Sequence, residues 1–194
     1  MKKTGSVKKM VVGVDVGGTN VKLGLIDPDG HIAARSGLAT KDHGRNRGQL
    51  ITALAAAVTG LLDQAGVSGD AVSGVGIGLP GLIDVEQGVV KVLPNVPGWK
   101  NVPLRRILED RLGLRVRLEN DVNLITLGEW RFGAGVGVDN LVCLTLGTGV
   151  GAGLILNGAL YRGEGFAAGE LGHMPLKEAG PPCPGGGPGC LESY

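Results

Sequence analysis

The chain has 194 residues, of which 43% are hydrophobic and 19% charged, so it can bury a core and is not a disordered tail. Its formal net charge of +1 provides no basic field for a nucleic-acid backbone, so nucleic acid is not expected as a partner. No stretch approaches the roughly 20 apolar residues that span a bilayer, so no membrane association is expected.

Three cysteines are too few, and too odd in number, for a disulfide framework. The apolar run that follows the lysines near the start is broken at once by Asp15, which argues against an export signal. Both observations favour a cytoplasmic, reducing location. Residues 1–9 are expected to form a flexible N-terminus.

The first part of the chain, residues 10–120, predicts an α/β domain. Runs rich in β-branched residues and bounded by turn residues predict strands, and Ala- and Leu-rich runs with helical spacing predict helices closed by Gly66 and Gly113. In chain order we expect strands at 10–16, 21–26 and 31–38, a helix at 49–65, strands at 72–79 and 89–93, a loop at 94–98, a helix at 103–112 and a strand at 114–118.

The second part, residues 121–194, predicts a partial α/β domain. We expect a helix at 122–132, strands at 141–146 and 150–156, and a hairpin leading to 159–161. From Gly163 onward the sequence is typical of loops, and the proline- and glycine-rich run 180–190 excludes regular structure. The alternation of strands and helices in both parts indicates the α/β class.

Two glycine–threonine turns, each between apolar strands, predict binding sites for phosphate groups. The first is formed by Gly17, Gly18, Thr19 and Asn20, and the second by Gly147, Thr148 and Gly149. Successive glycines expose backbone N–H groups that an anion can approach closely, although either turn alone is also compatible with an ordinary hairpin. Neither is a P-loop or a dinucleotide-binding turn, because GxxxxGK[ST] is absent and both turns lead into strands.

Two acidic residues accompany these turns. Asp15 ends the strand before the first turn, where a carboxylate can hold Mg²⁺ through waters. Asp121 follows a strand and opens a helix, where the helix dipole favours an ionised carboxylate. The residues alone leave two interpretations of Asp121 open, a helix N-cap and a catalytic group.

The order of motifs resembles the ROK family of kinases and repressors, within the actin-like ATPase superfamily, from about residue 10 to the last residue. The motifs are DVGGT at 15–19, GLPG at 78–81, ENDVN at 119–123, GTGVGAG at 147–153, ELGH at 170–173 and GCLE at 189–192. The resemblance implies an actin-like ATPase (ribonuclease H-like) fold of two similar α/β domains with a cleft between them. It also implies that the second domain is incomplete and that its sheet keeps an uncovered apolar face.

The resemblance further implies ATP-dependent phosphorylation of a hexose, most simply glucose, with Asp121 as the catalytic base. The implied sugar-binding residues are Gly81, Asn95, Asn120, Asp121, Glu170, His173 and Glu192. The implied residues for ATP and Mg²⁺ are Asp15, Gly17, Gly18, Thr19, Asn20, Lys22, Gly147, Thr148 and Gly149. Asn95 is also compatible with a simple turn residue beside two prolines. Family members often form dimers or tetramers, so a homo-oligomer is an expectation as well.

The family's zinc site uses one histidine and three cysteines, and this sequence departs from it. His173, Cys183 and Cys190 match three of the ligands, but Gly185 stands where the middle cysteine is expected. Because structural zinc takes four ligands, zinc is expected either to bind with a water or another donor in the fourth place or to be absent. Cys143 lies in an expected strand and is assigned to the core.

Other functions stay open beside a glucokinase. They are a kinase for N-acetylmannosamine, mannose or fructose, a non-catalytic sugar-binding member of the family, and a sugar-responsive regulator. The regulator is disfavoured because only nine residues precede the first strand, where such proteins carry a helix-turn-helix domain. Polyphosphate also remains open as an alternative phosphoryl donor.

Overall fold

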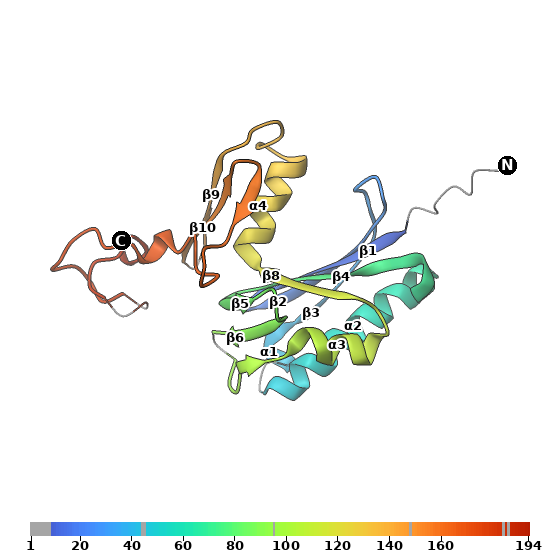
Figure 1. Ribbon diagram of the computed structural model, residues 1–194. Coiled ribbons are helices and arrows are strands. Elements are labelled where there is room, and N and C mark those ends of the chain that lie inside the picture. Colours follow the sequence, from blue (N-terminus) through green and yellow to red (C-terminus); the bar gives the residue numbers. More distant parts are fainter. Residues whose placement is uncertain (1–8, 44–45, 95, 148, 184, 186) are drawn as a thin grey trace. The chain divides into compact units, whose positions relative to one another are not determined.

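The computed structural model describes residues 9–43, 46–94, 96–147, 149–183, 185 and 187–194. Apart from Lys9, the expected flexible terminus lies outside the described residues. The chain divides after Asn120 into two compact units, which are considered one at a time (Figure 1). In the described part of the chain, no helix is both long and apolar enough to cross a membrane.

The first unit contains a five-stranded sheet, three α-helices and a smaller sheet. In chain order its elements are β1 Met10–Val16, β2 Asn20–Ile26, β3 Ile32–Ala39, α1 Thr40–His43, α2 Arg47–Ala65, the short 3₁₀ turn Gly69–Ala71, β4 Val72–Leu79, β5 Leu82–Asp84, β6 Val89–Val92, β7 Lys100–Val102, α3 Leu104–Leu112 and β8 Val116–Asn120. As predicted, α2 and α3 end at glycines in the left-handed conformation, Gly66 and Gly113.

The five strands lie in the order β3-β2-β1-β4-β8. Strands β1 to β3 form an antiparallel meander, whereas β4 runs parallel to both β1 and β8. In this register Asp15 lies opposite Gly78, and Gly78 lies opposite Glu119. The carboxyl ends of β1, β4 and β8 therefore meet at one edge of the sheet, as parallel pairing requires.

The core of this unit lies between the sheet and helices α2 and α3, which lie on the same side of it (Figure 1). Alternate side chains of β1 are buried, Val12, Val14 and Val16, because successive residues of a strand point to opposite faces. Helix α2 contributes Leu50, Leu54 and Leu61 to the same core, each at most 1% exposed. Burying one such side chain stabilises the fold by roughly 1.5–3 kcal/mol.

A three-stranded antiparallel sheet, in the order β5-β6-β7, contains two strands that the sequence analysis did not predict. Strands β5 and β7 have only three residues each, too few to produce a detectable alternation of apolar and polar residues. The last strand also differs from its prediction, because β8 covers 116–120 instead of 114–118.

The second unit has a helix packed on a three-stranded antiparallel sheet. Its elements are α4 Asp121–Phe132, β9 Leu141–Leu146, β10 Val150–Leu156, β11 Ala159–Tyr161 and the 3₁₀ turns η2 Leu171–His173 and η3 Leu191–Ser193. The order is β11-β10-β9. Gly153 faces Thr126 of α4 so closely that a Cβ atom there would overlap the threonine hydroxyl.

Strand β9 exposes an apolar row. Val142, Leu144 and Leu146 are 56%, 55% and 81% exposed, and their spacing of two places them on one face of the sheet. Helix α4 contacts both β9 and β10, and its Val122 and Thr126 lie against Gly151 and Gly153 of β10. The sheet of the second unit thus has an uncovered apolar face in the described part of the chain, as the sequence analysis expected.

Asp84, at the end of β5, makes stability depend on pH. Its buried carboxylate accepts a hydrogen bond from the Gln87 N–H at 2.9 Å and lies 3.2 Å from the Lys91 ammonium. The Gln87 hydrogen bond, with help from Lys91, holds the pKa of Asp84 below its ordinary value. A lowered pKa contributes stability that is present above the unfolded-state pKa and is lost as the pH falls through the folded-state pKa.

We therefore expect Asp84→Asn to lower the free energy of unfolding at neutral pH and to have a smaller effect below the ordinary aspartate pKa of about 3.9. Urea unfolding of both proteins at neutral and acidic pH measures the two differences, with Asp110→Asn on the exposed face of α3 as the control. Equal destabilisation at both pH values would show that the Asp84 charge is not responsible.

Candidate functional site

The first glycine turn is held in a tight form by its own backbone. The Gly17 N–H donates to the Asn20 carbonyl oxygen at 2.9 Å, and a Cβ atom at Gly17 would lie 3.0 Å from that oxygen. Within the described residues, the N–H groups of Gly18 and Thr19 have no hydrogen-bond acceptor. Two neighbouring backbone donors at an exposed turn are suited to an anion.

Two charged residues flank this turn on one face of the sheet. Asp15 and Lys22 are directly opposite each other in the β1–β2 ladder, and both are exposed. Side chains of directly paired residues stand on the same face. A carboxylate and an ammonium therefore lie on one face of the sheet, one residue pair before the pair that precedes the turn, and both groups can interact with a phosphate chain and its cation.

Thr40, which the sequence analysis did not single out, fastens the same turn. Its hydroxyl donates to the Gly17 carbonyl oxygen at 2.8 Å, and its N–H donates to the Thr19 carbonyl oxygen at 2.9 Å. Thr40 is 4% exposed and begins α1, a helix of only four residues. A helix of four residues is too short to show a helical period in the sequence. The only sequence signal for its start is a threonine that follows an apolar strand.

The predicted sugar-binding residues of the first unit lie at the same edge. The Asn120 side-chain amide donates to the Gly81 carbonyl oxygen at 3.3 Å, which joins the end of β8 to the turn after β4. Gly81 has φ +95°, and a Cβ atom there would overlap the Val92 carbonyl oxygen. Only glycine therefore fits this turn, and Asn120 is held against it.

Asp121 comes directly after Asn120 and is the first residue of α4. Its carboxylate accepts a hydrogen bond from the Val122 N–H at 2.9 Å, and the side chain is half-buried. The carboxylate thus lies at the N-terminus of α4, the positive end of the helix dipole. The geometry accommodates both interpretations of Asp121, since a carboxylate has about four lone-pair sites and can accept several hydrogen bonds.

The second glycine turn is closed by a residue from the end of the chain. The Gly147 N–H donates to the Gly149 carbonyl oxygen at 3.0 Å, and the Glu192 carboxylate accepts from the Val150 N–H at 2.9 Å. A Cβ atom at Gly149 would overlap this carboxylate, so the turn and Glu192 are packed together. Glu192 was predicted as a sugar-binding residue, and its contact with this turn was not predicted.

His173 lies between a carboxylate and the sulfur atoms of two cysteines. Its Nε2 is 3.9 Å from the Glu170 carboxylate, and its Nδ1 is 3.4 Å from the Cys183 sulfur. The ligand atoms of His173, Cys183 and Cys190 all lie within 4.8 Å of one another. A carboxylate on one imidazole nitrogen and a metal on the other is a common arrangement in zinc sites.

The cysteine pair differs from the sequence-based expectation. Cys183 and Cys190 are joined as a disulfide, so their sulfur atoms become metal ligands only after reduction. Gly185 faces the same group, because a Cβ atom there would lie 2.9 Å from the His173 Nδ1. In the reduced state His173, Cys183 and Cys190 offer three of the four ligands that a structural zinc site needs, and the glycine at position 185 supplies no fourth.

Two predicted site residues, Asn95 and Thr148, lie outside the described residues. The remaining ones gather in two places. Within the first unit Asp15, the first glycine turn, Lys22, Gly81 and Asn120 lie at the carboxyl edge of the parallel strands. Within the second unit the second turn lies against Glu192, next to η2 and its His173.

The chain is similar to known proteins of one family. The model of the ROK family matches residues 11–194. The glucokinase of Thermotoga maritima is 43% identical over 188 residues, which are 96% of this chain and 57% of that protein. The xylose repressor of Caldicellulosiruptor bescii is 33% identical over 184 residues, which are 95% of this chain and 46% of the repressor.

Among solved structures, a ROK family glucokinase from Streptomyces griseus in complex with glucose and AMPPNP is similar, with a TM-score of 0.82 and 39% identity. That match covers 95% of this chain and 56% of the glucokinase. The chain therefore spans a little over half the length of the glucokinases that it matches. Its α/β architecture is that of the actin-like ATPases, and the chain belongs to the ROK family.

Proposed function

We propose that this chain carries the sugar and phosphate sites of an ATP-dependent hexose kinase, with glucose as the substrate. The observation that carries the proposal is the position of Asp121, a half-buried carboxylate at the start of α4 next to an asparagine that is held against Gly81. The similarity to glucokinases at 37–43% identity supports the choice of sugar.

In the proposed reaction a sugar hydroxyl oxygen attacks the γ-phosphorus of ATP. A new O–P bond forms, the bond from the γ-phosphorus to the β,γ-bridging oxygen breaks, and ADP leaves with that oxygen. Asp121 accepts the hydroxyl proton. Phosphoryl transfer requires little covalent chemistry from the protein, so positioning and charge stabilisation provide most of the rate.

The two glycine turns would hold the phosphate groups. The N–H groups of Gly18 and Thr19 have no acceptor within the described residues, and Lys22 lies on the same face as Asp15. Asp15 would hold Mg²⁺ through waters, and that cation would neutralise charge on the phosphate oxygens. Gly147 and Gly149 would supply the second turn in the other unit.

The proposed sugar contacts combine donors and acceptors, as a polyhydroxylated ligand needs. Asn120 would present its amide, and Glu170, His173 and Glu192 would accept or donate to hydroxyl groups. Differences between hexoses involve one or two hydroxyls, so mannose, fructose and N-acetylmannosamine are the competing substrates. Polyphosphate is the competing phosphoryl donor, and a glucomannokinase of Arthrobacter that is described with polyphosphate and ATP is 31% identical.

The kinase proposal predicts that Asp121→Asn lowers the rate of ADP release by about 10²–10⁴-fold, because a general base contributes that much. Glucose affinity should change little, since asparagine keeps one oxygen acceptor. A coupled assay for ADP with the four sugars, together with calorimetric glucose binding, measures both quantities. Asp110→Asn, on an exposed helix face, serves as the control.

Two outcomes would contradict the proposal. One is an Asp121→Asn protein that turns over as fast as its parent. The other is a parent chain that binds glucose and ATP but releases no ADP with any of the four sugars. The latter result would support a sugar-responsive binding protein, a class represented among the relatives by xylose repressors.

We expect Glu192 to affect the binding of both the nucleotide and glucose, one carboxylate oxygen holding the second glycine turn and the other contacting the sugar. The alanine variant removes the acceptor of the half-buried Val150 N–H and should weaken both nucleotide and glucose binding, because the second glycine turn loses the contact that holds it. The glutamine variant keeps an oxygen acceptor and should weaken glucose binding more than nucleotide binding. Titrations with a fluorescent ATP analogue and with glucose test this, and equal nucleotide affinities of the alanine variant and its parent would refute the positioning role.

We also propose that the reduced cysteine pair and His173 bind Zn²⁺ weakly, because position 185 provides no ligand. The purified, reduced protein should contain less than one zinc per chain. Gly185→Cys should raise the zinc content toward stoichiometry and increase resistance to a chelator, since it adds a fourth ligand facing His173.

Gly187→Cys is the matched control for this substitution, because a Cβ atom at Gly187 meets no atom within 4 Å. Elemental analysis after exposure to a chelator gives the result. Stoichiometric, chelator-resistant zinc in the unmodified protein would contradict the proposal. Equal zinc contents in the two cysteine variants would show that position 185 is not where the fourth zinc ligand is needed.

A further inference from the structure

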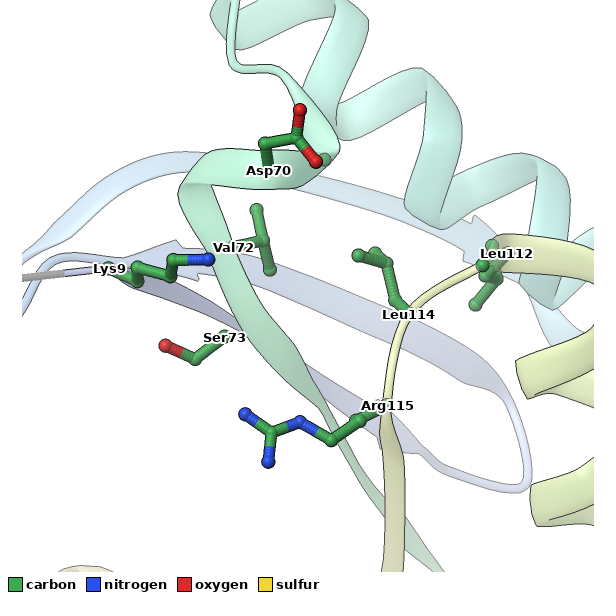
Figure 2. A pocket seen from close by; sticks show the side chains of 9 residues that line it. Lys9, Asp70, Val72, Ser73, Leu112, Leu114 and Arg115 are labelled. Carbon is green, nitrogen blue, oxygen red and sulfur yellow. The ribbon is translucent and has the colours of Figure 1, made fainter.

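A cavity of about 310 Å³ lies in the first unit, away from the residues assigned to the proposed kinase reaction (Figure 2). It is formed where the 3₁₀ turn before β4 meets the segment between α3 and β8. Its lining residues are Lys9, Gly69, Asp70, Val72, Ser73, Leu112, Gly113, Leu114 and Arg115.

The sheet register separates this cavity from the candidate site. Met10 pairs with Val72, and Val75 pairs with Val116, so the cavity lies at the amino-terminal ends of β1, β4 and β8. Asp15 is five residues further along β1, which corresponds to roughly 16 Å at about 3.3 Å per residue. A ligand in the cavity would therefore not occupy the first glycine turn.

Two cations and a hydroxyl line the cavity. Within the described part of the chain, the Lys9 ammonium and the Arg115 guanidinium form no ion pair, and Ser73 makes no side-chain hydrogen bond. In Figure 2 the Ser73 side chain lies between those of Lys9 and Arg115, and the Asp70 carboxylate points away from Ser73 and Arg115. Arginine, lysine and hydroxyl donors together suit the oxygens of a phosphate group.

The apolar wall of the cavity consists of Val72, Leu112 and Leu114. A volume of about 310 Å³ is at the lower limit of the range for small-molecule sites, and it exceeds what a single phosphate ion fills. The lining therefore matches a phosphate group attached to a small organic part better than it matches inorganic phosphate.

We propose that this cavity binds a small phosphate monoester, with Arg115 and Lys9 on the phosphate, Ser73 donating to it, and the apolar wall against the organic part. The site does not depend on the proposed kinase function. A ligand there would contact the starts of three strands whose other ends carry the candidate site.

Isothermal titration of the 194-residue chain with glycerol 3-phosphate, inorganic phosphate and glycerol tests the proposal. We expect the ester to bind more tightly than inorganic phosphate, and glycerol not to bind. Arg115→Gln and Lys9→Gln should each weaken ester binding by at least about tenfold, as loss of a charged hydrogen bond implies. Lys9 is exposed and directly precedes β1, so its substitution should not disturb the fold. Lys9→Gln therefore tests the proposal even if Arg115→Gln unfolds the protein.

Two controls distinguish the cavity from other anion sites. Arg106→Gln removes a cation that is 83% exposed on α3 and should leave ester affinity unchanged. Gly17→Val adds a side chain at the first glycine turn and should also leave the ester affinity unchanged. The proposal is overturned if the ester does not bind, if neither Arg115→Gln nor Lys9→Gln weakens its binding, or if Gly17→Val abolishes it.

Discussion

Parallel pairing of β4 with both β1 and β8 is the constraint on which the candidate site of the first unit depends. It aligns Asp15, Gly78 and Glu119 across three strands that are far apart in the sequence. Ligand sites of open α/β sheets lie at the carboxyl ends of the strands, and here the glycine turn, Gly81 and Asn120 all follow from that alignment. The same register places the lysine- and arginine-lined cavity at the opposite ends of these strands.

In the second unit, glycines allow the segment after β11 to pack closely against the backbone of β10. A Cβ atom at Gly169 would overlap the Ala152 carbonyl oxygen, and one at Gly172 would overlap that of Val150. These approaches bring the segment that carries Glu170 and His173 onto β10, where a larger residue would hold it away. At these two positions glycine is therefore required by the way the segment with Glu170 and His173 is positioned.

The pattern of apolar and polar residues predicted those helices and strands that are long enough for the pattern to repeat. The limits of β1, β4 and β9 agree with the expected strands, and Gly66 ends α2 as expected. Strands β5 and β7 were too short to detect, and residues 114–115 proved to precede β8 and to line the cavity. Contacts between distant segments were beyond sequence reasoning, above all Thr40 with the first turn and Glu192 with Val150.

The proposed kinase function depends on the Asp121 carboxylate at the start of α4, which would accept the proton of a sugar hydroxyl. The most direct test is a crystal structure of the chain with glucose and a non-hydrolysable ATP analogue. We predict that an Asp121 carboxylate oxygen will lie within hydrogen-bond distance, about 2.6–3.2 Å, of the hydroxyl nearest the γ-phosphate. Glucose bound with that hydroxyl out of reach of Asp121, and beside another base, would contradict the account.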